Sequence, residues 1–167
     1  MKDNTALLMK MIAFDAGDAE RIQHFVKVYE FAKIIGTLEK LSPKEQHILE
    51  TAAIVHDIGI HPAEKKYGSC EGKLQEKEGA PEAEKMLQSL NYDNDVINRV
   101  AYLVGHHHTY TNVEGMDYRI LLEADFLVNL FEEKSGKEAI EAAYRNIFRT
   151  EAGKRICREM FGISEVL

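Results

Sequence analysis

Residues 52–59 read Ala52-Ala53-Ile54-Val55-His56-Asp57-Ile58-Gly59, an apolar run that ends in a histidine, an aspartate and a glycine. The run follows Ser42-Pro43-Lys44-Glu45, which combines a capping box with proline at the first helical position and so predicts a helix start. Ile48, Ala52 and Val55 recur at helical spacing, and Gly59 predicts the end of the helix. Two ionisable residues are therefore expected at the end of a buried helix.

Helical signals continue on both sides of this run. Upstream, Asp18 can cap a helix that reaches about Ile35, with Gly36 just past its end. A polar, glycine-containing loop is expected from about Ile60 to Gly79. Further helices are expected from Pro81 to Leu90, from Asp93 to the histidines at 106–108, from Asp117 through Phe131, from Gly136 to Phe148, and from Thr150 to Gly162. No run alternates as a strand would, so the prediction is an all-α fold of about six to seven helices.

Length and composition fit one compact domain. The 167 residues are predicted to form a single domain, with a motif-bearing core at about 18–130 and C-terminal helices at about 137–162. A formal net charge of -7 argues against binding a nucleic acid polymer, which needs a basic surface. Cys70 and Cys157 match no metal-binding spacing and are expected to be reduced thiols. Without a signal peptide or an apolar run of membrane-spanning length, a cytoplasmic protein is expected; the oligomeric state is not indicated.

Two further polar residues lie on helix faces that should be apolar. His24 shares its face with Val28 and Ile35, and Asp125 is in line with Leu121 and Val128. A carboxylate in such a place costs several kcal/mol unless it is paired or binds a metal. Taken alone, His24 could be an ordinary core histidine, and Asp125 could pair with an arginine, either Arg99 or Arg119.

Taken together, these residues form a ligand set. His24, His56, Asp57 and Asp125 supply two imidazoles and two carboxylates. Such a mixture suits Mn, Fe, Co, Ni or Zn, and Mg less well. Adjacent residues in mid-helix do not share a face, but a helix end lets His56 and Asp57 turn toward one ion.

The order and context of the four residues resemble the H…HD…D signature of the HD superfamily. The resemblance covers roughly residues 18–130 and includes Ala-Ile-Val-His-Asp-Ile-Gly and the Glu-Ala-Asp-Phe that contains Asp125. It implies a helical bundle around a metal held by those four residues, and hydrolysis of phosphate esters, often nucleotides. Many relatives have lysine directly after the glycine, where this chain has Ile60.

Relatives that bind two metals add a histidine in the region after the HD pair and another on the helix before the final aspartate. His106 or His107 matches the second of these, whereas Glu78 stands where the first is usual. A carboxylate there could still bind or bridge a metal. The alternative is that Glu78 is solvated at a helix start and the histidines contact substrate.

Phosphate contacts are expected in the segment that follows the HD pair. Lys65 and Lys66 attract anions, and His61 could contact substrate or donate a proton. Lysines and histidines in a surface loop are also often only solvated.

The predicted function is therefore metal-assisted hydrolysis of a small phosphate monoester or diester, such as a nucleotide, with one or two ions. Asp57 would bind the ion and orient the attacking water. Two alternatives remain open. One is a dinuclear-iron oxygenase on the same scaffold, and the other is a nucleotide-binding sensor without turnover, suggested by Ile60.

Overall fold

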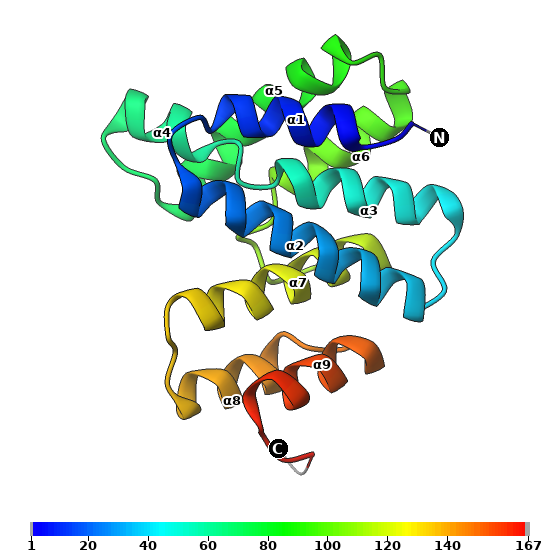
Figure 1. Ribbon diagram of the computed structural model, residues 1–167, viewed down its shortest axis with the longest axis vertical. Coiled ribbons are helices and arrows are strands. Elements are labelled where there is room, and N and C mark those ends of the chain that lie inside the picture. Colours follow the sequence, from blue (N-terminus) through cyan, green and yellow to red (C-terminus); the bar gives the residue numbers. More distant parts are fainter. Residues whose placement is uncertain (1, 166–167) are drawn as a thin grey trace.

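The computed structural model describes residues 2–165, and the chain within that range forms nine helices and no strands (Figure 1). The helices are α1 Thr5–Phe14, α2 Ala19–Leu38, α3 Pro43–Val55, α4 Ile60–Tyr67, α5 Gly72–Ser89, α6 Asn94–Val104, α7 Met116–Glu132, α8 Lys137–Asn146 and α9 Glu151–Phe161. The all-α prediction is confirmed, but the expected count of six to seven helices was too low. None of the helices in the described range has the length and apolar character needed to cross a bilayer.

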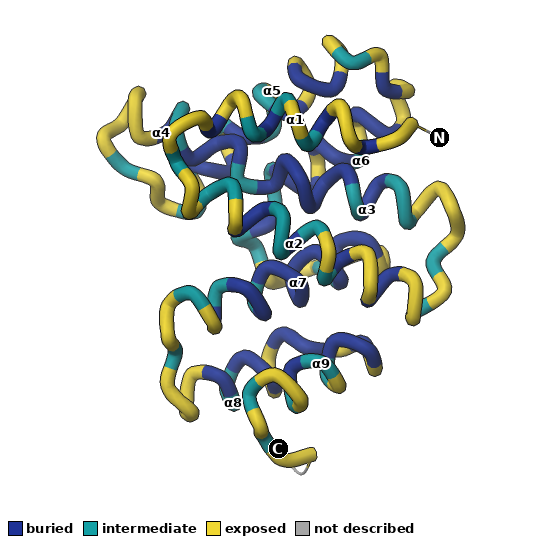
Figure 2. Tube along the Cα trace, in the orientation of Figure 1, coloured by how far each residue is buried: buried dark blue, intermediate teal, exposed yellow. Residues whose placement is uncertain are grey.

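Helices α2, α3 and α7 pack against one another and form the centre of the molecule (Figure 1). Val28, Ala52 and Leu121, one from each of these helices, are completely buried. Helices α5 and α6 pack together on the far side of α3, while α8 and α9 form a pair below α7. Figure 2 shows many buried positions on the central helices, and the polar residues His24 of α2 and Asp125 of α7 are among the buried ones.

Several predicted helix ends are confirmed. The Ser42 side chain accepts from the N–H of Glu45, whose side chain in turn caps Ser42, as the capping box requires. Asp18 accepts from the N–H of Arg21 at the start of α2, and Thr150 accepts from the N–H of Gly153 at the start of α9. These bonds satisfy backbone donors that have no partner inside the helix.

The expected helix end at Gly36 is wrong, because α2 continues to Leu38. A Cβ atom at position 36 would lie 2.3 Å from Gln46 Oε1 and 3.0 Å from Leu49 Cδ2. Gly36 therefore allows α3 to approach α2 closely and does not terminate a helix.

The expected loop at 60–79 is also wrong. Its first part is α4, which ends at Gly68 with a φ of 67° in the left-handed region, and its second part is the first half of α5. A Cβ at Gly59 would lie 2.3 Å from the carbonyl oxygen of Gln75, so α5 packs directly over the break before α4. This packing explains why α5 begins well before Pro81, which lies inside the helix despite its cost there.

Helix α1 was not expected from the sequence, where its short length gives little periodicity. It is held by Leu7 and Met11, both buried, and by Asn4, whose side-chain oxygen accepts from the Tyr92 hydroxyl. The predicted Asp117 cap is also wrong. Helix α7 begins after Gly115, at a φ of 94°, and Asp117 pairs with Arg99 at 2.7 Å.

The C-terminal helices are fastened to α7 by a buried carboxylate. Glu123 is completely buried and accepts from the N–H groups of Arg149 (2.6 Å) and Thr150 (2.9 Å) and from the Thr150 hydroxyl (2.5 Å). Burial raises the pKa of Glu123, while these hydrogen bonds act in the opposite direction. Because α7 also carries Asp125, this contact ties the C-terminal helices to the helix that bears a candidate ligand.

Candidate metal centre

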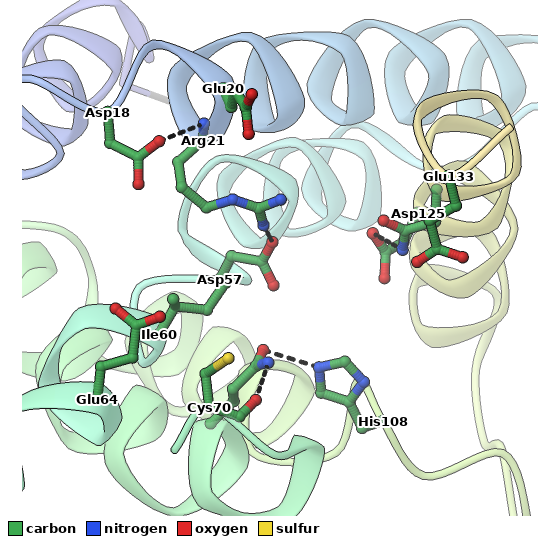
Figure 3. Close-up of a pocket in the computed structure, with 12 residues that line it drawn as sticks. Asp18, Glu20, Arg21, Asp57, Ile60, Glu64, Cys70, His108, Asp125 and Glu133 are labelled. Atoms are coloured by element: carbon green, nitrogen blue, oxygen red, sulfur yellow. Dashed lines mark hydrogen bonds and ion pairs between the residues drawn. The ribbon is translucent and has the colours of Figure 1, made fainter. Parts of the chain in front are cut away.

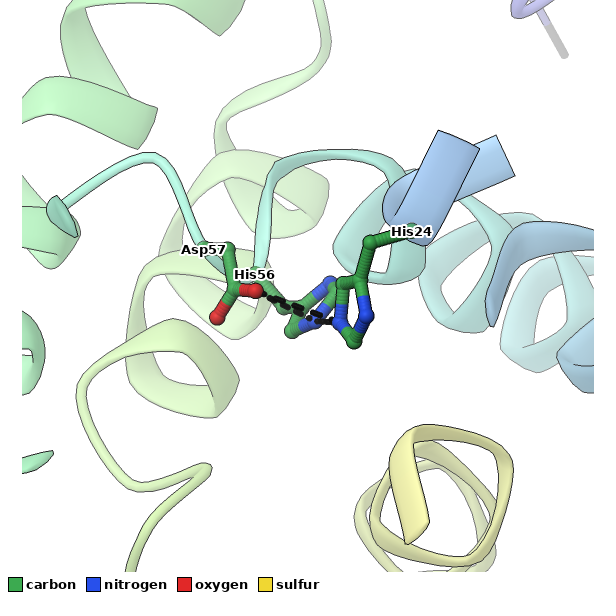
Figure 4. A group of neighbouring side chains, drawn as sticks. All are labelled: His24, His56 and Asp57. Atoms are coloured by element: carbon green, nitrogen blue, oxygen red, sulfur yellow. Dashed lines mark hydrogen bonds and ion pairs between the residues drawn. The ribbon is translucent and has the colours of Figure 1, made fainter. Parts of the chain in front are cut away.

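Four predicted ligands meet at the junction of α2, α3 and α7. His24 Nε2 lies 3.2 Å from His56 Nε2, 3.1 Å from Asp125 Oδ1 and 3.2 Å from Asp57 Oδ2. His56 Nε2 lies 3.4 Å from the same two carboxylate oxygens. Figure 4 shows the His24 and His56 rings and the Asp57 carboxylate turned toward one another. Asp125 pairs with neither Arg99 nor Arg119 among the described residues, because its carboxylate contacts His24, His56 and Asn129.

A break between α3 and α4 brings the adjacent His56 and Asp57 to one point. Helix α3 ends at Val55, and the turn that follows is closed by short-range bonds from Ile58 N–H to the Val55 carbonyl and from Ile60 N–H to the Asp57 carbonyl. In a continuous helix the two side chains would point about 100° apart. The turn removes that separation.

Each histidine of the cluster has its Nδ1 atom held from outside. His56 Nδ1 lies 2.7 Å from the carbonyl oxygen of Ala53, and His24 Nδ1 lies 2.9 Å from Glu132 Oε1. Because a carbonyl oxygen only accepts, His56 Nδ1 carries a proton, and a neutral ring therefore presents the Nε2 lone pair to the cluster. Outer contacts of this kind orient imidazoles that bind metals.

The spacing of the donor atoms fits a shared cation. Ligand atoms about 2.1 Å from one ion lie about 3.0 Å apart in octahedral geometry and about 3.4 Å apart in tetrahedral geometry. His24 Nε2 and His56 Nε2 lie 3.2 Å apart, and their contacts to Asp57 Oδ2 and Asp125 Oδ1 span 3.1–3.4 Å. The donor atoms of His24, His56 and Asp57 lie within 4.8 Å of one another, while Asp125 joins this group through its contacts with the two histidines. Neutral imidazoles would bring two lone pairs together at 3.2 Å, which needs a cation or a proton between them.

The electrostatics of the cluster are mutually dependent. Burial acts to lower the pKa of His56, but Asp57 and Asp125 outweigh it and hold that pKa well above 6.5. Burial acts to raise the pKa of Asp57, but the neighbouring imidazoles, chiefly His56, hold it well below 3.8. Without a metal, the positive charge of protonated His56 therefore stabilises the two carboxylates. A metal ion would take the place of that proton.

A second group of donors shares Asp57 with the first. Asp57, His107 and His108 have donor atoms within 4.8 Å of one another. His107 Nδ1 lies 2.7 Å from the Val104 carbonyl oxygen, and its Nε2 lies 3.3 Å from Asp57 Oδ1. This Nε2 atom is buried and makes no hydrogen bond to any described residue, so its lone pair is available for a metal ion.

His108 is held by an amide. Its Nε2 atom lies 2.8 Å from Gln75 Oε1, and the Gln75 amide nitrogen donates to the Cys70 carbonyl. An amide oxygen accepts, so His108 carries its proton on Nε2 and presents the Nδ1 lone pair. Burial, reinforced by His107, lowers the pKa of His108 to about 4, so this imidazole is neutral near pH 7.

The other expected ligands of a second metal lie apart from both groups. His106 Nδ1 lies 2.7 Å from the Tyr102 carbonyl oxygen, and its ring stacks on Tyr102 with centroids 4.1 Å apart. Glu78 accepts from the Tyr67 hydroxyl and from Lys66. Of the two histidines considered at this position, the structure brings His107 to Asp57.

A cavity of about 360 Å³ opens beside the cluster, lined among others by Asp57, Asp125, Gln75 and His108 (Figure 3). Arg21 also lines it, and its guanidinium lies 2.7 Å from Asp57 Oδ2. Neither Lys65 nor Lys66 is among the lining residues, and Lys66 forms an ion pair with Glu78. His61 Nε2 lies 3.1 Å from Asp18, at the edge of the cavity.

Sequence reasoning missed Arg21, Gln75, Glu132 and His108 as parts of this site. Arg21 is three residues before His24, so helical spacing from a predicted ligand could have indicated it, whereas Gln75 lies in the segment that was expected to be a loop. Glu132 gave no such signal, because its position at the end of α7 reads as an ordinary surface residue.

Comparison with protein families and with individual proteins gave one match. The family model described as HD domain matches residues 21–159, which include His24, His56, Asp57 and Asp125. No curated protein and no solved structure matched the chain.

Proposed function

Because the chain belongs to the HD domain family, we propose that it is a metal-dependent phosphohydrolase that cleaves a small phosphate ester. The observation that carries the proposal is the set of 3.1–3.4 Å contacts that the His24 and His56 imidazoles make with the Asp57 and Asp125 carboxylates. This spacing suits a divalent ion of the Mn, Fe, Co, Ni or Zn type.

The proposed ligands are His24, His56, Asp57 and Asp125, with His107 and His108 available to a second ion beside Asp57. A bound ion supplies Lewis acidity that lowers the pKa of water toward about 7 and offsets phosphoryl charge. Asp57 is the proposed orienting group for the attacking water, because its two oxygens face different histidines, His24 and His107.

Arg21 is the proposed phosphate contact in place of Lys65 and Lys66. Its guanidinium reaches the cavity beside Asp57, whereas neither lysine lines the cavity. A guanidinium binds two phosphoryl oxygens at once, which fixes the orientation of the ester. In the reaction a water oxygen bonds to phosphorus, the phosphorus–oxygen ester bond breaks, and the alcohol leaves with a proton.

The test begins with elemental analysis of protein purified without added metal. We expect about one ion or more in the wild type and loss of that metal in Asp57→Ala. Hydrolysis of phosphate esters is then assayed with Mn, Co, Ni, Zn and Mg. A wild type that takes up none of these ions contradicts the proposal.

The second group of donors favours one alternative, a dinuclear-iron oxygenase, because it places His107 and His108 beside Asp57. Anaerobic assay separates the two functions, since hydrolysis needs no dioxygen. Activity that requires both iron and dioxygen would replace the phosphohydrolase proposal.

A further inference from the structure

The cavity beside the candidate metal centre is strongly acidic for a pocket that receives a phosphate ester. Besides Asp57 and Asp125, the carboxylates that line it are those of Asp18, Glu20, Glu64 and Glu133. Arg21 is the only lysine or arginine among the lining residues that the structure describes. Figure 3 shows these carboxylates around the cavity, with the Arg21 guanidinium directed at Asp57.

Half of the outer carboxylates have no basic partner. Asp18 and Glu64 each lie near the His61 ring, at 3.1 and 3.3 Å. Glu20 and Glu133, in contrast, form no ion pair with any residue in the 2–165 range. Both side chains are exposed, so the outer rim of the cavity keeps negative charge that no described basic residue neutralises and that solvent partly screens.

The inner part of the cavity, in contrast, can bind an anion. Asp57 lines the cavity, and its Oδ1 atom lies 3.3 Å from His107 Nε2, a buried atom behind the lining that makes no hydrogen bond within the described chain and is available to the proposed cation. Together with Arg21, that cation would accommodate one phosphate. A second anionic group on the substrate would meet carboxylates and be repelled, whereas a cationic group would be attracted.

The walls of the cavity also lack a large aromatic ring for a nucleobase, since His108 supplies the one ring among the described lining residues. No Phe or Tyr ring is among the described lining residues, whose least polar members are Ile60 and Cys70. Recognition of a base normally uses an aromatic face. Both features argue against nucleotides, and most strongly against those with several phosphates.

We propose that the substrate is a small phosphate monoester that carries a protonated amine, a phosphorylated amino alcohol in chemical class. Glu20 and Glu133 would bind the ammonium group while the metal and Arg21 bind the phosphate. This inference rests on the proposed function and specifies its substrate.

Three esters of nearly equal size test the inference: 2-aminoethyl phosphate, 2-hydroxyethyl phosphate and phosphoglycolate. They differ in the charge opposite the phosphate, which is positive, neutral or negative. For the metal-loaded full chain, binding is measured by calorimetry and turnover by phosphate release. We expect the aminoethyl ester to bind about 10-fold more tightly than the hydroxyethyl ester, and phosphoglycolate to bind most weakly. Salt should reduce the differences.

Variants identify the carboxylates responsible. Glu20→Gln and Glu133→Gln should each reduce the preference for the aminoethyl ester over the hydroxyethyl ester by about 3-fold or more. Glu30→Gln is the matched control, because it removes the same charge from an exposed position on α2 outside the cavity. We expect this control to keep the wild-type preference.

The outcomes separate the two proposals. Equal or tighter binding of the neutral or anionic ester overturns the amine inference, even where hydrolysis supports the phosphohydrolase. The expected binding order without any phosphate release supports the inference about the pocket and contradicts the hydrolase. If no ester binds to the metal-loaded protein, both fail.

Discussion

His24 Nδ1 lies 2.9 Å from the Glu132 carboxylate, whereas the corresponding atoms of His56 and His107 face main-chain carbonyl oxygens. One ligand of the candidate centre is thus oriented by a side chain that a substitution can remove. Glu132 also lies 3.3 Å from Lys27, which limits its movement.

Replacement of Glu132 should therefore weaken metal binding without removing a ligand. We expect Glu132→Ala to lower the affinity for Zn²⁺ or Mn²⁺ by about 10–100-fold. Glu132→Gln should have a smaller effect, because its amide oxygen still accepts from His24 Nδ1. Competition with a chelator measures the affinity, with the exposed Glu138→Ala as control. Equal affinity in all four proteins would mean that Glu132 does not orient His24.

Removal of the metal should lower thermal stability. A ligand at about 100 times its dissociation constant stabilises the folded state by about 2.7 kcal/mol. For a chain of this size we expect a fall in Tm of about 5–10 °C. Calorimetry before and after chelation, and again after the metal is restored, measures the change. A Tm that does not respond to chelation would be evidence against a bound ion.

The metal-free protein should lose stability as pH rises above neutrality. The raised pKa of His56 contributes stability that is complete below 6.5 and is lost as pH rises through the raised value. The lowered pKa of Asp57 contributes stability present above 3.8, which is lost as pH falls through the lowered value. The pair therefore favours the metal-free fold most between pH 3.8 and 6.5.

Metal binding should reverse this trend, because an ion needs the unprotonated His56. We expect the Tm of the metal-loaded protein to rise relative to that of the metal-free protein between pH 6 and 8. Thermal unfolding of both forms across this range provides the measurement. Parallel curves would show that His56 does not exchange a proton for the metal.

Loss of Arg21 should impair substrate binding more than loss of either lysine. We expect Arg21→Ala to reduce kcat/KM for a phosphate ester by about 10–100-fold, mainly through KM. Lys66→Ala removes an equal charge from a residue paired with Glu78 and should change kcat/KM by less than about 3-fold. The reverse order would support the phosphate role that the sequence predicted for Lys66.

The contact between Glu123 and the start of α9 should be important for stability. Glu123→Ala leaves the buried N–H of Thr150 and the partly buried N–H of Arg149 without an acceptor and should destabilise the protein by about 3 kcal/mol. Glu123→Gln should cost less, because burial already disfavours the charged carboxylate. Urea unfolding measures the free energy of unfolding of both variants. Equal losses of stability would mean that the charge of Glu123, and not its hydrogen bonds, stabilises the protein.

The sequence was most informative where a polar residue interrupts an apolar pattern. His24 and Asp125 stand on apolar helix faces, and the structure brings both to the His56 and Asp57 pair. Burial of a charge is costly enough for such an exception to indicate a site. The same reasoning could not find Gln75, because a polar residue at an intermediate position is ordinary in any sequence. Arg21 could have been found only through its helical spacing from His24.

The prediction that failed most clearly was the loop expected after His56 and Asp57, at residues 60–79. Its many polar and glycine residues suggested a loop, but α4 and α5 form there because the Gly59 and Gly79 backbones approach each other closely. That contact joins residues far apart in the chain, which local periodicity does not reveal. Lys65 and Lys66 were placed near the phosphate for the same reason.

The distance along the chain between His24 and Asp125 also limits when an ion can be acquired. These two residues touch through His24 Nε2 and Asp125 Oδ1 across 101 positions. Synthesis at about 5–20 residues per second separates their appearance by about 5–20 s. During that interval the nascent chain holds at most an incomplete set of ligands. The proposed ligand set would therefore be complete only after Asp125 has been synthesised and α7 has packed against α2.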